Sequence, residues 1–437
     1  MSSPWLIDTR PLKVVPFRRL WLSTAVTAVG SQLTAVAVPK QVFDLTNSSG
    51  YVGLAGAVAL VPLLVFGLWG GAVADAMDRR TLLVFTNAGI ALTSVLLWAQ
   101  AAAHLNSVWI VLALLFVQQS FFAMNQPARN ASIARLIPLD LLPSASALNS
   151  TVFQFGAVLG PMLAGVLIPV LGIQTLYLID AIGLCVTMWA VWKLPPLPPM
   201  GANRQRAGLA SVIDGFRYLA KQNVLLVSYL ADIIAMIFGM PRALFPQMAE
   251  QTFGDPPGGG VALGWLFAAI PIGAVVCGLF SGWLSRAPRH GIGTILAVGV
   301  WGLAMLGFGL SHSLWLAVIF LAIGGGADMV SMAFRGAIQQ SVATDDMRGR
   351  MQGVFTVVVA GGPRLADVLH GTMGAAVGTG AAVAGGGALV VLCLIPTMLI
   401  FPAFWRYRAT LSGAKDKIIE AARPAEPAVE TGSETTG

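Results

Sequence analysis

Charged side chains are scarce in this chain. Only 10% of its 437 residues are Asp, Glu, Lys or Arg, whereas 56% are hydrophobic, and a water-soluble protein usually carries about 25% charged residues. So few charges cannot cover a soluble body of this size, and most of the surface must therefore face lipid. This excludes a soluble enzyme and, despite a formal net charge of +7, a nucleic-acid-binding domain. The apolar runs last about 20 residues without period-2 alternation, which excludes an outer-membrane barrel.

Cysteines and catalytic motifs are also nearly absent. The three cysteines lie far apart inside apolar stretches, so they give neither a disulfide framework nor a metal-binding spacing. The sequence contains no GxxxxGKS/T phosphate loop, no HExxH zinc motif and no nucleophile elbow. We therefore expect no enzymatic activity, no cofactor, no metal site and no direct use of ATP.

Twelve apolar stretches are each long enough to cross a bilayer. Backbone groups in lipid must bond internally, so each stretch predicts a helix of about 20 residues. Their approximate ranges are 20–39, 51–74, 81–103, 107–126, 145–169, 172–192, 223–249, 260–284, 291–311, 314–334, 351–377 and 382–405. The predicted fold class is an all-α integral membrane protein with twelve transmembrane helices.

Basic residues are distributed unevenly between the loops. Most of the 26 Lys and Arg residues lie in the N-terminal segment, in alternate loops and in the C-terminal tail. The positive-inside rule then places both termini in the cytoplasm. We expect a multi-pass protein of a bacterial cytoplasmic membrane, acting as a monomer in the lipid bilayer.

A polar stretch divides the twelve spans into two groups of six. Residues 193–222 include four prolines and five basic residues, and we interpret them as a cytoplasmic linker. Apolar residues at helical spacing over 209–221 predict an amphipathic helix on the membrane surface. The predicted organisation is a cytoplasmic N-terminal segment (1–19), an N-terminal six-helix bundle (20–192), the linker (193–222), a C-terminal six-helix bundle (223–408) and a disordered cytoplasmic tail (409–437).

The two groups of spans share sequence landmarks. Gly71 and Gly278 follow the second span of each half and are 207 residues apart, and Arg129 and Arg335 follow the fourth span and are 206 apart. Two pseudo-symmetric six-helix bundles facing one cavity are typical of transporters, whose substrate site lies near the midplane between the halves. The repeat therefore predicts a transporter of a small molecule.

Several motifs resemble one known family. The string from Gly70 to Arg80, GGAVADAMDRR, resembles the signature of the major facilitator superfamily between its second and third helices. The string Gly156-x-x-x-Gly160-Pro161-x-x-Ala164-Gly165 is similar to the fifth-helix motif of drug exporters. Residues 125–129 (NQPAR), 326–331 (GADMVS) and 345–350 (DDMRGR) look like the enterobactin-exporter-like and multidrug-efflux-like bacterial branch.

The resemblance implies roles for two groups of residues. Gly71, Asp75, Arg79 and Arg80 would form a latch for the outward-facing state, although the arginines could instead serve topology alone. Gly156, Gly160, Pro161 and Gly165 would make the fifth helix flexible and tightly packed and bias the direction of transport, or simply allow close packing. The family implies secondary active export of a hydrophobic or amphiphilic molecule, drug or siderophore-like, by alternating access with proton antiport. An importer of a small metabolite or sugar is the alternative.

One departure from the family concerns proton coupling. Proton-coupled drug exporters of the superfamily often carry an arginine within the fourth helix. In this sequence the fourth span has no cation before Arg129, near its predicted cytoplasmic end. The departure argues against a mechanism in which a fourth-helix arginine is the proton partner.

Ionisable residues inside the spans are candidates for coupling or substrate contact, because each costs at least about 2.5 kcal/mol at a helix centre. Asp232 is the first candidate for the proton carrier, since no basic residue lies within a helical turn of it. Asp328 is the second. Asp367 is the third, because Arg364 at i−3 can pair with it. A structural hydrogen bond or ion pair remains the alternative for each carboxylate.

Polar residues in the first and fourth spans indicate a cavity wall. Gln119 and Gln126 share one face of the fourth span, and Gln32 occupies the first. They could contact the substrate or form interhelical hydrogen bonds. Residues 239–242 (GMPR) and Pro246 predict a broken end of the seventh span, either a gate or an ordinary helix end.

Overall fold

The computed structural model describes residues 8–198, 209–287 and 289–407. Within these ranges, the side chains of 68–69, 71–72, 74–76, 209–212, 285, 345–346, 348–350, 352 and 356 are not described. The predicted tail (409–437) therefore lies wholly outside the described part.

The N-terminal half consists of five long helices. They are α1 (Val15–Thr46), α2 (Ser49–Ala76), α3 (Arg79–Ala102), α4 (Val108–Leu136) and α5 (Leu142–Trp192), with the 3-10 turns η1 (Arg10–Lys13) and η2 (Leu139–Leu141). At Gly172 in α5 the backbone has φ +77°, which a residue with a Cβ rarely adopts. The 51-residue α5 is therefore two crossings joined by a tight turn, at the place where the sequence predicts the boundary between two spans.

The C-terminal half is built from shorter pieces. Its elements are α6 (Leu209–Lys221), α7 (Asn223–Gly239), η3 (Arg242–Leu244), α8 (Phe245–Gln251), α9 (Val261–Leu279), η4 (Ser281–Arg286), α10 (His290–Leu310), α11 (Leu314–Val342), α12 (Asp345–Val377), α13 (Thr379–Ile400) and α14 (Pro402–Trp405). The helix predicted over 209–221 is present as α6. The predicted break after Gly239 is also present, because Pro241 cannot donate a helical hydrogen bond.

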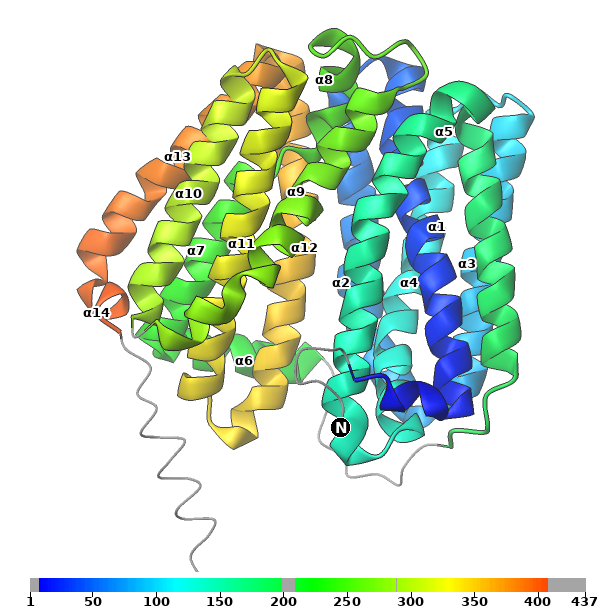
Figure 1. Ribbon diagram of the computed structural model, residues 1–437, viewed down its shortest axis with the longest axis horizontal. Helices are drawn as coiled ribbons and strands as arrows, with labels where there is room; N and C mark the ends of the chain where they lie inside the picture. The colour runs from blue at the N-terminus through cyan, green and yellow to red at the C-terminus, as the bar shows by residue number, and fades with distance from the viewer. Residues whose placement is uncertain (1–7, 199–208, 288, 408–437) are drawn as a thin grey trace, which may run out of the picture.

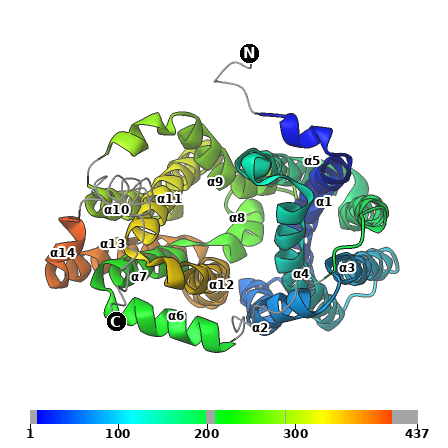
Figure 2. The ribbon, with the colours of Figure 1, turned by 90° about the horizontal axis from the view of Figure 1, so that it is seen from below.

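The helices provide twelve crossings. Ten described segments are long and apolar enough to span a membrane by length and composition. One of them contains both halves of α5, and α12, which is not among the ten, adds a crossing of 33 residues. Figures 1 and 2 show α1–α5 and α7–α13 as two bundles side by side. We call the end where η1, α6 and α14 lie, at the bottom of Figure 1, the terminal end.

Among the helix boundaries that differ from the predicted ones, three affect the site. The eighth predicted span continues to residue 284, but α9 ends at Leu279 and continues as the 3-10 turn η4. The fourth and tenth helices are longer than predicted, so Arg129 and Arg335 lie inside α4 and α11 rather than in loops. Arg335 is 7% exposed. Hydropathy underestimated these helices because their terminal-end turns are polar while remaining packed within protein.

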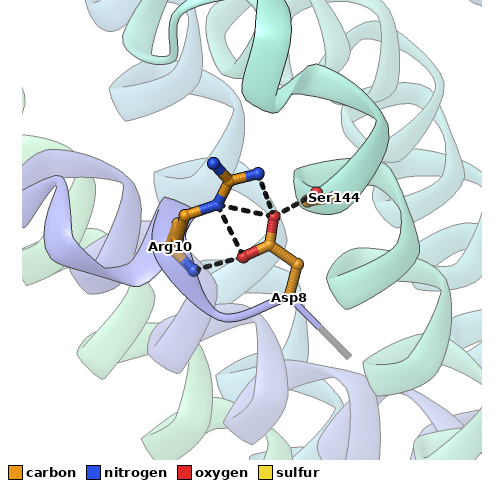
Figure 3. Close-up of polar contacts among 3 residues, drawn as sticks. All are labelled: Asp8, Arg10 and Ser144. Carbon is orange, nitrogen blue, oxygen red and sulfur yellow. Dashed lines mark hydrogen bonds and ion pairs between the residues drawn. The ribbon is translucent and has the colours of Figure 1, made fainter. Parts of the chain in front are cut away.

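The segment before α1 is tied to the start of α5 (Figure 3). Arg10 pairs with Asp8 at 2.8 Å, and the Ser144 hydroxyl donates a hydrogen bond of 2.9 Å to the same carboxylate. These donors stabilise the charged form, chiefly through Arg10, and hold the pKa of Asp8 well below its usual range. This contact fixes η1 against the terminal end of the N-terminal bundle.

Candidate functional site

The two bundles meet along α2 and α12 at the end opposite the termini. The Ser49 hydroxyl donates to the Gly371 carbonyl at 3.1 Å. A Cβ added to Gly53 would lie 2.6 Å from the Asp367 carbonyl oxygen and 3.1 Å from the Gly371 Cα. Only residues without a side chain permit this backbone approach, so the glycines of α2 and α12 form a close seam between the bundles.

A second seam joins α5 to α9. A Cβ on Gly165 would lie 2.8 Å from the Cα of Gly264, and a Cβ on Gly264 would lie 2.8 Å from the Pro161 carbonyl oxygen. Gly156 and Gly160 instead pack on α1. The fifth-helix motif therefore makes two kinds of contact. Gly156 and Gly160 pack within the N-terminal half, whereas Pro161 and Gly165 contact the C-terminal half.

An ion cluster lies beside these seams. Lys40 of α1, whose side chain is 1% exposed, pairs with Asp44 of the same helix and with Glu250 of α8 in the other half. A buried cation with two carboxylates connects the bundles more specifically than apolar packing does. This ion cluster and the two glycine seams connect the bundles at the end opposite the termini. We call this end the joined end.

A buried charge cluster lies within the C-terminal half. The Arg335 guanidinium of α11 pairs with Asp232 of α7 at 2.5 Å and with Asp328 of its own helix at 4.0 Å. Side-chain exposures are 8% for Arg335, 3% for Asp232 and 31% for Asp328. With all groups ionised, this Asp232–Arg335–Asp328 cluster holds two negative charges and one positive charge, and the charge of Arg242 in η3 also acts on Asp328.

The cluster corrects the interpretation of Asp232 as a carboxylate with no cation nearby. No basic residue lies near it along α7, as the sequence indicates, but the fold brings Arg335 from another helix into direct contact. Arg335 was treated as a loop residue in the sequence, and this interpretation was wrong. Its buried position could have been suspected from its place in the internal repeat opposite Arg129.

Among the described side chains, no carboxylate pair lies at the corresponding place in the N-terminal half. There Arg129 of α4 donates to the Thr24 hydroxyl of α1. The arginines are thus placed alike in the two repeats, but one faces a hydroxyl and the other faces a carboxylate. Of these two arginines, only Arg335 of the C-terminal half contacts carboxylates among the described side chains.

The remaining predicted residues fall into separate places. Arg364 and Asp367 of α12 form an ion pair of 3.7 Å along one helix. Gln32, Gln119 and Gln126 are half-buried, and none of them makes a side-chain hydrogen bond to another described residue. Their neighbours on α4 do form interhelical bonds, from Gln118 to Ser94 and from Asn125 to Thr86.

The proposed latch is described only in part, because the side chains of Gly71 and Asp75 lie outside the described set. Arg80 donates to the Trp192 carbonyl at 2.7 Å. The Asp78 carboxylate accepts from the Arg80 and Leu197 backbone amides at 2.8 and 3.0 Å. These contacts hold the start of α3 against the end of α5 within one half.

One further buried acid lies in the second crossing of α5 and accepts hydrogen bonds from a separate group of hydroxyls. Asp180 of α5 is 3% exposed and accepts hydrogen bonds from Thr34 at 2.8 Å and Ser94 at 3.0 Å. The described residues place no cation beside it. The network links α1, α3 and α5 of the N-terminal half.

Two pseudo-symmetric six-helix bundles, joined at one end and carrying a buried charge cluster, define a transporter of the major facilitator fold. Residues 7–414 match the family model described as "Transmembrane secretion effector", and the chain belongs to this major facilitator family. It is therefore a secondary transporter of the membrane and not an enzyme. The predicted family and the twelve-helix fold are confirmed.

Sequence similarity to named proteins supports the same family. The chain is 28% identical over 422 residues to "Enterobactin exporter EntS" of Shigella boydii serotype 18, covering 93% of this chain and 97% of that one. The protein of that name from Escherichia coli O81 matches equally well.

Solved structures share the fold at low identity. A bacterial homolog of the human lysosomal transporter Spinster, in an inward-facing and unoccupied conformation, matches with a TM-score of 0.69 at 16% identity over 91% of this chain and 97% of that one. The nucleoside transporter NupG matches with a TM-score of 0.66 at 13% identity over 90% and 100%.

Proposed function

We propose that this protein exports a small hydrophobic or amphiphilic molecule across the bacterial cytoplasmic membrane by proton antiport. The Asp232–Arg335–Asp328 cluster is the observation that carries the proposal. A buried group of charges that does not sum to zero is costly in a low-dielectric interior. Among the described residues Asp328 has no close ion pair, so binding a proton or a cationic group there relieves a poorly compensated charge, and the cluster can exchange a proton for substrate.

Asp328 is the proton carrier in this proposal, ahead of Asp232. Asp232 lies against Arg335 at 2.5 Å and is almost fully buried, whereas Asp328 is 4.0 Å from the same cation and 31% exposed. The closer ion pair favours the charged form of Asp232. The looser contact and the greater access leave Asp328 free to load and release a proton as the cavity changes sides. Asp367 remains third because of Arg364.

The proposed substrate class is supported by the polar side chains on α1 and α4 and by the named proteins that this chain resembles. Gln32, Gln119 and Gln126 are half-buried and free to hydrogen-bond a bound molecule, on helices otherwise rich in apolar residues. Such walls suit an amphiphile with a few polar groups. The enterobactin exporters favour a siderophore-like molecule among these, and the fifth-helix motif favours export over import of a metabolite.

The joined end is the periplasmic end in this proposal, and both termini lie in the cytoplasm. The present state then opens toward the cytoplasm, ready to receive the exported molecule. In the opposite state the seams and the Lys40–Glu250 pair separate. Asp75, Arg79 and Arg80 next to Gly71 would then latch the terminal ends of the two halves together.

The coupling assignment is tested in proteoliposomes that hold the purified protein under an imposed pH gradient. Enterobactin and the dye ethidium serve as probes. Asp328→Asn should abolish accumulation against a gradient while downhill exchange survives, because asparagine keeps the shape but cannot carry the proton. Asp367→Asn is the matched control, since it also removes one intramembrane carboxylate, and it should still accumulate substrate. Accumulation by Asp328→Asn that still stops with a protonophore would place the carrier elsewhere.

A further inference from the structure

An apolar groove lies on the outside of the C-terminal bundle, between α9, α10 and α11. Its volume is about 540 Å³, within the roughly 300–1,000 Å³ of sites that hold small molecules. Leu296 and Val300 of α10 and Ile323 of α11 line it and are 62%, 43% and 47% exposed. Because these side chains face outward, the groove opens to the hydrocarbon of the bilayer.

The groove exists because α9 stops early. The equivalent helix α2 continues to Ala76, whereas α9 ends at Leu279 and gives way to the narrower η4. On α11, residues Ile323, Ala327, Val330 and Phe334 line the groove, and they follow one helical face. The repeat therefore predicts a continuous helix at this place, and the structure leaves an apolar space instead.

Cations stand at the terminal end of the groove. Arg289 lines it directly, and Arg286 follows at the end of η4. Both arginines are exposed, and no acidic side chain within the described ranges pairs with either. Trp283, also in the lining and 52% exposed, is of the type that marks the level of the lipid headgroups.

We propose that this groove binds one anionic phospholipid, with an acyl chain along α10 and α11 and its phosphate on Arg289. An apolar trough that ends in an unpaired guanidinium matches the two parts of such a molecule, and arginine is well suited to phosphate. The membrane itself supplies the ligand at high local concentration.

The bound lipid would also support the charge cluster. Asp328 and Arg335 lie next in sequence to Ala327 and Phe334, two groove residues of α11. An acyl chain against this face limits the tilt of α11 and holds the cluster geometry. This consequence for transport depends on the proposed function, but the binding itself does not.

Native mass spectrometry of the full-length protein in detergent tests the site, with phosphatidylglycerol and phosphatidylcholine as the titrated lipids. The wild type should retain phosphatidylglycerol preferentially. Arg289→Gln should reduce that preference about fivefold, the effect of one basic residue near anionic lipid. Lys193→Gln removes one charge in the other half and should leave the preference unchanged.

The apolar part is tested by filling the groove. Val300→Trp should lower retention of both lipids, whereas Leu392→Trp, on α13 and 57% exposed but away from the groove, should not. If Val300→Trp does not elute as a monodisperse protein, Ile323→Trp replaces it. Unchanged preference in Arg289→Gln, or unchanged retention in the filled variants, would overturn the site whether or not the protein exports anything.

Discussion

At the scale of single residues, the charge cluster concentrates the unusual chemistry of the C-terminal half. Arg335 neutralises Asp232 and leaves Asp328 less closely paired, so one guanidinium sets different environments for two carboxylates. Asp232 would not tolerate the loss of that cation, because a buried charge without a partner costs far more than a pair contributes.

Arg335→Gln should therefore lower the free energy of unfolding by about 3–5 kcal/mol, seen as a lower melting temperature in detergent. Adding Asp232→Asn to that variant should recover most of the loss, because the most buried carboxylate is then neutral. Arg217→Gln is the control, since its side chain is 76% exposed and a surface pair contributes about 0–1 kcal/mol. A double variant no more stable than Arg335→Gln would contradict the pairing.

At the scale of elements, glycines decide where the halves can meet. Along α5, Gly165 and Pro161 touch α9, and along α2, Gly53 touches α12. These helices approach closely enough that a side chain would intrude on a backbone. The seams depend on the close fit of small residues and not on an interlocking set of large side chains.

Gly165→Leu should shift the protein toward the state that is open at the joined end, because leucine cannot fit against Gly264. Spin labels at Leu105 and His312, in loops of the two halves, should then move apart in a pulsed distance measurement. Gly385→Leu is the matched control: this glycine lies on an exposed face of α13, and a Cβ there meets nothing within 4 Å. An unchanged distance in Gly165→Leu would show that the α5–α9 seam does not hold that end closed.

At the scale of the whole molecule, the two repeats differ in their buried polar contacts. The N-terminal half pairs Arg129 with a hydroxyl and buries Asp180 among hydroxyl donors. The C-terminal half pairs its arginine with acids and opens a lipid-facing groove. The two halves therefore share one scaffold but differ in chemistry. The C-terminal half carries the Asp232–Arg335–Asp328 cluster, and the N-terminal half provides the facing surface.

The direction of transport is a property of the whole molecule. Everted membrane vesicles that contain the protein should accumulate ethidium or enterobactin when energised, because the binding site then faces the medium in the proposed resting state. Intact cells should lose the same compounds faster as expression rises. Uptake by intact cells that rises with expression would instead favour the importer.

The sequence by itself determined the class of this protein and the layout of its helices. Hydrophobicity over about 20 residues, scarce charge and a repeated set of glycine and arginine landmarks depend on local composition, so they can be read along the chain. They predicted twelve helices in two halves, the α6 helix and the break after Gly239, while the resemblance of the motifs indicated the superfamily. The family motifs also pointed to the glycines of α5 as packing residues.

Only the tertiary structure decided which charges meet. Asp232 and Arg335 are 103 residues apart, and no local pattern tells that α7 and α11 bring them to 2.5 Å. The Lys40–Glu250 pair joins positions separated by 210 residues, and the groove arises where α9 stops early beside two other helices. Contacts of this kind depend on how helices are placed relative to one another, and each helix alone retains the same hydropathy whichever partner it packs against.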